Sequence, residues 1–217
     1  METYNPNFAL LDSQNEFFSE ENYEVSDTAW ELLHGAIDTH VHSNPTRDDG
    51  FVLDDFELVR EYEDAGLDGV VIKCHEFGTF FRSKIAQKYA VKGDKFKVYG
   101  SICLNYEVGG LNPVAVEAAI MGGAKMSIAM QREMARLGVK MEKSFYEFDR
   151  DRSLRSFMKE AGTKPSDYVM SSDQGMFPAL RALRGYACNV QEHLNGGVPA
   201  EDLKVMLQDV PHFLMEG

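Results

Sequence analysis

Two histidines spaced two residues apart, with an acid two residues before the first, are the strongest chemical pattern in this sequence. They lie in GAIDTHVHSNPTR, where Asp38, His40 and His42 occupy alternate positions. Successive side chains of a β-strand point to opposite faces, so a strand here would present all three on one face. Two imidazoles at the carboxyl end of a parallel strand could bind one divalent ion. The alternative is a polar strand end whose histidines bond to neighbouring backbone.

A second pair with the same spacing occurs in VVIKCHEFG. Lys73 and His75 would share one face near the end of a second strand. Lys73 could bind an anionic group of a substrate, and His75 could act as a ligand or as a proton carrier. The alternative is that Lys73 extends to solvent and His75 only closes a loop.

An aspartate follows the last expected strand, in YVMSSDQGM. Asp173 at a strand tip could bind the metal or act as general base for a water activated by it, and Ser171 shares its face. The alternative is that Asp173 or Ser172 begins the next helix as its N-cap. Glu142 and Glu147 are weaker carboxylate candidates, because exposed helical positions are their default.

The elements that position these residues follow a strand–helix rhythm. Three strand–helix units in succession predict a parallel sheet with right-handed crossovers. The rhythm breaks where a predicted helix follows another without a strand between them, and it then resumes. The predicted strands are 36–42, 68–75, 95–105, 139–145 and 166–173. The predicted helices are 53–66, 79–91, 112–124, 126–138, 150–162, 178–196 and 199–210, the last of them ending before Pro211.

Composition limits the class of protein. The chain has 217 residues, which suits a single domain over residues 35–217 after an N-terminal arm of residues 1–34. A net charge of −13 disfavours nucleic acid as a partner, and no apolar run reaches the length of about 20 residues that a membrane span needs. Three cysteines without a CxxC pair favour reduced thiols and a cytoplasmic protein. The expected partner is a small-molecule substrate.

IDTHVHSNP at the end of a first strand resembles the signature of the amidohydrolase superfamily of metal-dependent hydrolases. The segments AGLDGVVIKCHE, VYGSICLNYEVGGLNPVAVEAAIMGGAK and YVMSSDQGM extend the resemblance to an uncharacterised amidohydrolase-like family. The resemblance implies a barrel of the TIM type, with His40 and His42 as the first-strand metal pair and Asp173 as the acid of the last strand. It implies hydrolysis of a small amide, lactone or ester by a metal-activated water, with zinc as the expected ion.

The chain is shorter than that family pattern. Such barrels have eight strand–helix units in about 250 residues, whereas five strands are predicted here. The missing part falls after Lys125, and no position matches the ligand lysine and later histidines of the superfamily. We therefore expect an α/β fold, a partial or open barrel of about five parallel strands. Its exposed strand edges need a cover, for which the helix from Met126 to Leu137 or the N-terminal arm could serve. The expected partner for an edge left uncovered is a second copy of the chain, in a homodimer. The alternative function is a non-catalytic partial barrel that binds a ligand or a partner.

Overall fold

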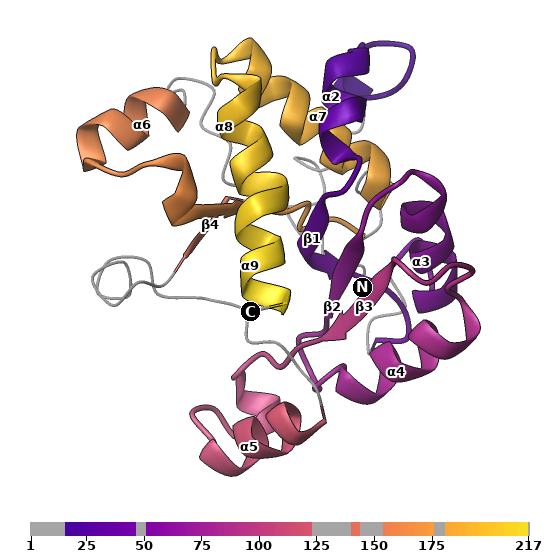
Figure 1. Ribbon diagram of the computed structural model, residues 1–217. Helices are drawn as coiled ribbons and strands as arrows, with labels where there is room; N and C mark the ends of the chain where they lie inside the picture. The colour runs from indigo at the N-terminus through magenta and orange to yellow at the C-terminus, as the bar shows by residue number, and fades with distance from the viewer. Residues whose placement is uncertain (1–15, 47–50, 123–139, 144–153, 176–180, 217) are drawn as a thin grey trace, which may run out of the picture.

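The computed structural model describes residues 16–46, 51–122, 140–143, 154–175 and 181–216. Strands and helices alternate along its first half (Figure 1). That half contains α2 (Asp27–Leu33), β1 (Ile37–His42), α3 (Asp55–Asp64), β2 (Gly69–Lys73), α4 (Phe80–Tyr89), β3 (Lys97–Gly100), a 3₁₀ turn (Tyr106–Val108) and α5 (Pro113–Met121). The second half contains β4 (Met141–Lys143), α6 (Leu154–Ala161), a 3₁₀ turn (Pro165–Asp167), β5 (Tyr168–Met170), α7 (Ala182–Asn195), α8 (Ala200–Lys204), a π-helical turn (Val205–Asp209) and α9 (Val210–Glu216).

The first helices begin at side chains that satisfy their free backbone donors. The Ser26 side chain accepts a hydrogen bond from the amide of Ala29 at the start of α2. Asp54 accepts from the amides of Phe56 and Glu57, and the Glu57 side chain accepts from the Asp54 amide in return. This capping box fixes the start of α3 just after the loop that leaves β1.

All the paired strands run parallel, as predicted. β1, β2 and β3 form one sheet in that order, and β4 pairs with β5 in a second. The chain beyond β5 joins the two sheets, because the Asp173 amide donates to the His40 carbonyl at 2.8 Å and the His42 amide donates to the Gln174 carbonyl at 2.9 Å. Within the described residues these strands form an open α/β arrangement rather than a closed barrel.

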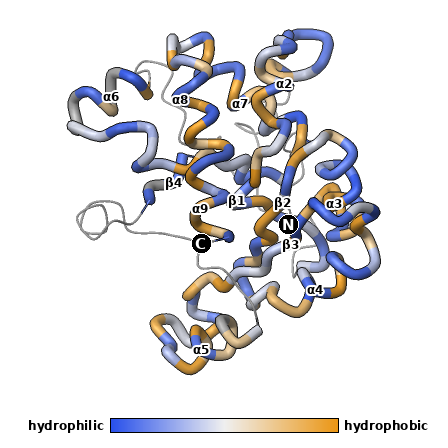
Figure 2. The backbone as a smooth tube through the Cα atoms, in the orientation of Figure 1, coloured by the Kyte–Doolittle hydropathy of each residue, from blue (hydrophilic) through white to orange (hydrophobic). Residues whose placement is uncertain are grey.

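Both faces of the three-stranded sheet are covered, which explains the continuous apolar run of β2. On one face, Ile37 and Val71 pack against Met215 of α9 (Figure 1). On the other face, Val70 and Ile72 belong to the main core together with residues of α3 and α4. The same core includes buried residues of β5 and α7, so both sheets pack around one apolar interior (Figure 2).

β3 is shorter than the predicted strand 95–105. After Gly100 the backbone of Ser101 bonds to a side chain instead of to β2: its amide donates to the Thr79 hydroxyl at 2.8 Å. The hydroxyls of Thr79 and Ser101 both donate to the Ile72 carbonyl, at 2.6 and 2.8 Å. Side-chain hydroxyls thus take over the hydrogen bonds with which a longer strand would have continued the ladder.

The predicted end of the last helix before Pro211 is wrong. Helix continues from Ala200 to Glu216, and Pro211 is the second residue of α9. The turn before it is π-helical, with the Val210 amide donating to the Val205 carbonyl. A proline removes one backbone donor and crowds the preceding turn, and a wider turn at that point accommodates both effects.

Some predictions concern residues outside the described ranges. The predicted helix 126–138 lies there entirely, as do the candidate Glu147 and the first fifteen residues of the N-terminal arm. Within the arm, Phe18 is buried and packs against Cys188 of α7. No helix in the described part of the chain has the length and apolarity that crossing a bilayer requires.

Candidate metal centre

Three side chains from distant parts of the sequence converge at the junction of the two sheets. His40 Nε2 lies 3.1 Å from His42 Nε2 and 3.1 Å from Asp173 Oδ1, and His42 Nε2 lies 3.5 Å from the same oxygen. Ligands at about 2.0–2.1 Å from a tetrahedral zinc ion are about 3.3–3.4 Å from one another. The three donor atoms already have that spacing, so this group could hold one metal ion.

Asp38 does not join the donor group, although strict alternation along β1 predicted one shared face. The pairing of β1 with β2 shifts register just after Asp38, which interrupts the alternation. Its carboxylate instead accepts from the amides of His40 and Ser172, at 3.1 and 3.0 Å, and from the Tyr62 hydroxyl at 2.8 Å. Complete burial raises the pKa of Asp38 to about 6 against the opposing effect of these hydrogen bonds. Asp38 therefore ties β1 to the chain beyond β5.

Asp173 reaches the histidines through an unusual backbone conformation. Its φ is 49°, the one positive value among the described residues other than glycine. Strained backbone of this kind costs about 1–3 kcal/mol and is concentrated at functional sites. Two residues later Gly175, at φ 124°, passes so close to β1 that a Cβ there would lie 2.0 Å from the His42 carbonyl oxygen. Only glycine fits this crossing.

The alternative that Asp173 or Ser172 serves as the N-cap of the next helix is wrong. α7 begins at Ala182 and its N-cap position is Arg181. The Ser172 amide donates to Asp38, and its hydroxyl lies 3.3 Å from the His40 carbonyl. Both residues therefore serve the junction with β1 and not the helix.

The local environment keeps the two donor types in the forms that bind metals. Burial lowers the pKa of His42 to about 4, and the Phe51 ring stacks on it with a centroid distance of 5.4 Å. Its Nδ1 is a buried atom with no hydrogen-bond partner among the residues that the structure describes. Burial opposes ionisation of Asp173, but its hydrogen bond with His42 and the charges of His40 and Lys73 outweigh it and hold the pKa below its usual value. A neutral imidazole beside an ionised carboxylate is a typical ligand combination.

Glu142 lies at the centre as well, which corrects the default placement on an exposed helix. It is in β4, and its Oε1 lies 2.7 Å from His40 Nδ1 and accepts from the Ser171 hydroxyl at 2.5 Å. Burial raises its pKa, but the contacts with His40 and Ser171 and the charge of Lys73 reverse that effect and lower it. The spacing of Glu142 in the sequence gave no sign of this role, because β4 has only three residues.

Lys73 and His75 lie on the opposite side of the histidines from β5. Lys73 ends β2, pairs in register with His42 and is 4% exposed, so the alternative of an extended, solvated lysine is wrong. The His75 ring is 4.7 Å from the His42 ring and tilted by 57°, and its residue is exposed. The Asn105 side chain donates to the His75 carbonyl at 3.0 Å and fixes that loop. Lys73 is thus an internal charge, whereas His75 is at the surface of the centre.

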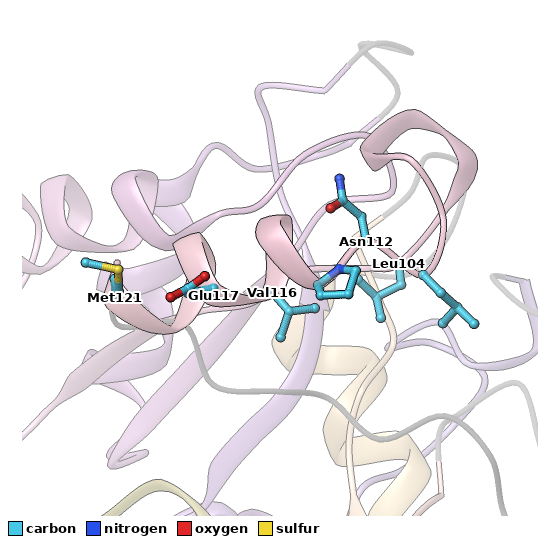
Figure 3. A pocket seen from close by; sticks show the side chains of 7 residues that line it. Leu104, Asn112, Val116, Glu117 and Met121 are labelled. Carbon is cyan, nitrogen blue, oxygen red and sulfur yellow. The ribbon is translucent and has the colours of Figure 1, made fainter.

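A groove of about 410 Å³ lies elsewhere, along α5 (Figure 3). Leu104, Val116 and Met121 give it an apolar wall, and Asn112 and Glu117 are its polar lining residues. None of the residues of the metal centre lines it. The groove is therefore a separate feature from the histidine–carboxylate cluster.

Comparison with known proteins gives a family match to one part of the chain, and this part contains some residues of the centre and not others. A family of unknown function, DUF6282, matches residues 35–130, which is less than half of the chain. No curated protein matches the chain. The matched range contains His40, His42, Lys73 and His75, whereas Glu142 and Asp173 lie beyond it.

Proposed function

We propose that this protein is a metal-dependent hydrolase of amidohydrolase type that acts on a small amide, lactone or ester. One observation carries the proposal: the Nε2 atoms of His40 and His42 and Oδ1 of Asp173 are 3.1–3.5 Å apart. Two imidazoles and one carboxylate suit zinc, which we propose as the ion. The resemblance of IDTHVHSNP to the superfamily signature supports the same reaction class.

The chain supplies distinct groups for such a reaction. When bound, a divalent ion would lower the pKa of a water and polarise the carbonyl of a substrate. Asp173 is the carboxylate that contacts the Nε2 atoms of both histidines, and we propose that it also accepts the proton of the attacking water. His75 is exposed beside His42 and would orient the substrate, with Lys73 supplying a fixed positive charge behind the histidines.

Metal content tests the centre directly. The purified protein, supplemented with zinc and dialysed, should retain about one ion per chain, whereas His40→Ala and His42→Ala should retain little. His34→Ala is the matched control, because that histidine is exposed and lies outside the centre. A wild-type protein without stoichiometric metal would rule out the proposed function.

The alternative is a non-catalytic partial barrel that binds a ligand or a partner. The observation in its favour is that the described residues offer only three clustered donors and an open strand arrangement. Turnover by the zinc-loaded protein on panels of amides, lactones, esters and phosphoesters separates the two. Metal binding without turnover on any panel would favour the alternative, and turnover limited to phosphoesters would change the substrate class.

We also propose that the protein is a homodimer. Among the described strands β3 is an edge of its sheet, and unpaired strand edges invite pairing with another chain. α4 exposes Phe81, Ile85 and Tyr89 at intervals of four residues. Light scattering during gel filtration should give twice the mass of the chain, and the mass of one chain would reject the dimer.

A further inference from the structure

We propose that Glu142 is the positioning residue for His40: it holds the ring proton on Nδ1 and thereby leaves Nε2 as the metal-binding atom. This inference rests on the metal centre of the proposed function. Its geometric basis is the 2.7 Å contact between His40 Nδ1 and Glu142 Oε1, the shorter of the two contacts that His40 makes with carboxylates.

The chemistry of imidazole makes this contact decisive. A neutral imidazole has one N–H and one lone pair, and the partner of one nitrogen decides which nitrogen can bind a metal. An ionised carboxylate only accepts hydrogen bonds, so Glu142 requires the N–H on Nδ1. At the other nitrogen, Asp173 Oδ1 at 3.1 Å is a competing acceptor. Without Glu142 the proton would move to Nε2 and bond to Asp173, and both atoms would be lost as ligands.

Glu142 is itself held in place, and it lies on the far side of the ring from the donor cluster. The Ser171 hydroxyl donates at 2.5 Å to the same Oε1 that contacts His40. Ser171 directly follows β5, and β4 pairs with β5 through Glu142 and Val169. The two short strands therefore fix the carboxylate on the Nδ1 side, where it orients His40 without joining the three donors. Carboxylates in this position typically contribute 10–100-fold to metal affinity.

Two measurements on Glu142→Leu, which removes the acceptor that glutamine would keep, test the inference. Titration with Co²⁺, followed by its visible absorbance, should show an affinity 10–100-fold below wild type. Long-range ¹H–¹⁵N correlation spectra of the metal-free protein, at a pH where imidazoles are neutral, should show the His40 proton on Nδ1 in wild type. In the variant that proton should lie largely on Nε2. A merely structural role for Glu142 would lower the melting temperature without moving the proton.

Matched variants define the comparison. Glu192→Leu removes the carboxylate of another part-buried glutamate, one that bonds Tyr23 outside the centre, and should leave the affinity and the tautomer unchanged. Ser171→Ala should produce a smaller shift of the same sign. If wild type binds no Co²⁺, the proposed function fails, and the metal-free spectra still decide the role of Glu142. An unmoved proton in Glu142→Leu, or a cobalt affinity within about 3-fold of wild type, would overturn the inference.

Discussion

The segment with β1, β2 and β3 and the segment with β4 and β5 are both parallel α/β units, yet they differ in regularity and in the groups at their strand ends. The first has strands of four to six residues, and a capping box begins the helix α3 between β1 and β2. The second has strands of three residues each. The first supplies the imidazoles of His40 and His42, and the second supplies the carboxylates of Glu142 and Asp173.

The two segments therefore supply different kinds of metal ligand: imidazoles come from the first segment and carboxylates from the second. The regular segment lies inside the match to the family of unknown function and provides the two imidazole donors from one strand. The short strands lie beyond that match and provide the negative charge that a cation needs. Neither segment alone holds the three donors, so the backbone crossing at residues 172–175 is what assembles them.

The crossing itself is the most sensitive point. Gly175→Ala should cost about 3 kcal/mol or more of unfolding free energy, because a Cβ would lie 2.0 Å from the His42 carbonyl and φ is 124°. Gly197→Ala also has a positive φ, 78°, but nothing lies within 4 Å of its Cβ, so about 1 kcal/mol is expected. Urea denaturation of both variants compares them. If both variants lost the same free energy of unfolding, the close packing of Gly175 against β1 would be contradicted.

The contribution of the second segment to metal binding can be removed without disturbing the histidines. Asp173→Asn should weaken zinc binding by about 100-fold or more, equivalent to about 2.7 kcal/mol, because the amide offers no negative charge. Competition with a chromophoric chelator measures the affinity, and Asp167→Asn, in the turn before β5, is the control. An affinity like that of wild type would mean that the imidazoles alone suffice.

Stability should also depend on pH through a buried histidine of the second segment. Burial, reinforced by the charge of Lys143, lowers the pKa of His193 to about 4. As the pH falls from about 6.5 toward 4, the unfolded chain takes up a proton that the native state refuses, so stability falls. Between about pH 7 and about pH 5 this histidine should account for about 2 kcal/mol. Denaturation of His193→Gln at about pH 7 and about pH 5 should show a loss of unfolding free energy that is smaller than in wild type by about 2 kcal/mol. A pH dependence like that of wild type would contradict the role of His193.

Within the first segment, one arginine fixes the loop that follows His42. Arg82 forms two hydrogen bonds with Asp55, at 2.9 and 2.6 Å, and donates to the carbonyls of Ser43 and Pro45. Arg82→Lys should cost about 1–2 kcal/mol, since lysine cannot reproduce the paired geometry. The matched Arg181→Lys, on an exposed pair with Glu61, should cost less than about 0.5 kcal/mol. Thermal denaturation measures both variants, and equal losses of stability in Arg82→Lys and Arg181→Lys would contradict the special role of Arg82.

The sequence predicted the regular segment well, because its information is local. Asp54 and Glu57 mark the start of α3, and the apolar run of β2 marks a strand covered on both faces. The pairing of His40 with His42 was predictable from their spacing. Asp173 was recognised as a strand-tip residue, and in the structure its Oδ1 lies 3.1 Å from His40 Nε2 and 3.5 Å from His42 Nε2.

The second segment was harder because its information is not local. Glu142 lies in the predicted strand 139–145, but three residues of strand give no periodicity, so nothing in the sequence marked it as a partner of His40. The register shift in β1 that withdraws Asp38 from the donors depends on pairing with β2, which no single strand reveals. The helix beyond Pro211 required a π-helical turn, which has no sequence signature of its own.

The bond between the Ser172 amide and Asp38 has a further consequence, because it joins positions 134 residues apart. Bringing such distant residues together costs chain entropy that nearer contacts do not incur, and contacts of this range slow folding. The donor cluster can therefore exist only after this loop of 134 residues has closed. A cation bound by the donor cluster would stabilise the closed loop. Its dissociation rate would then report how often the contact between β1 and the chain beyond β5 breaks.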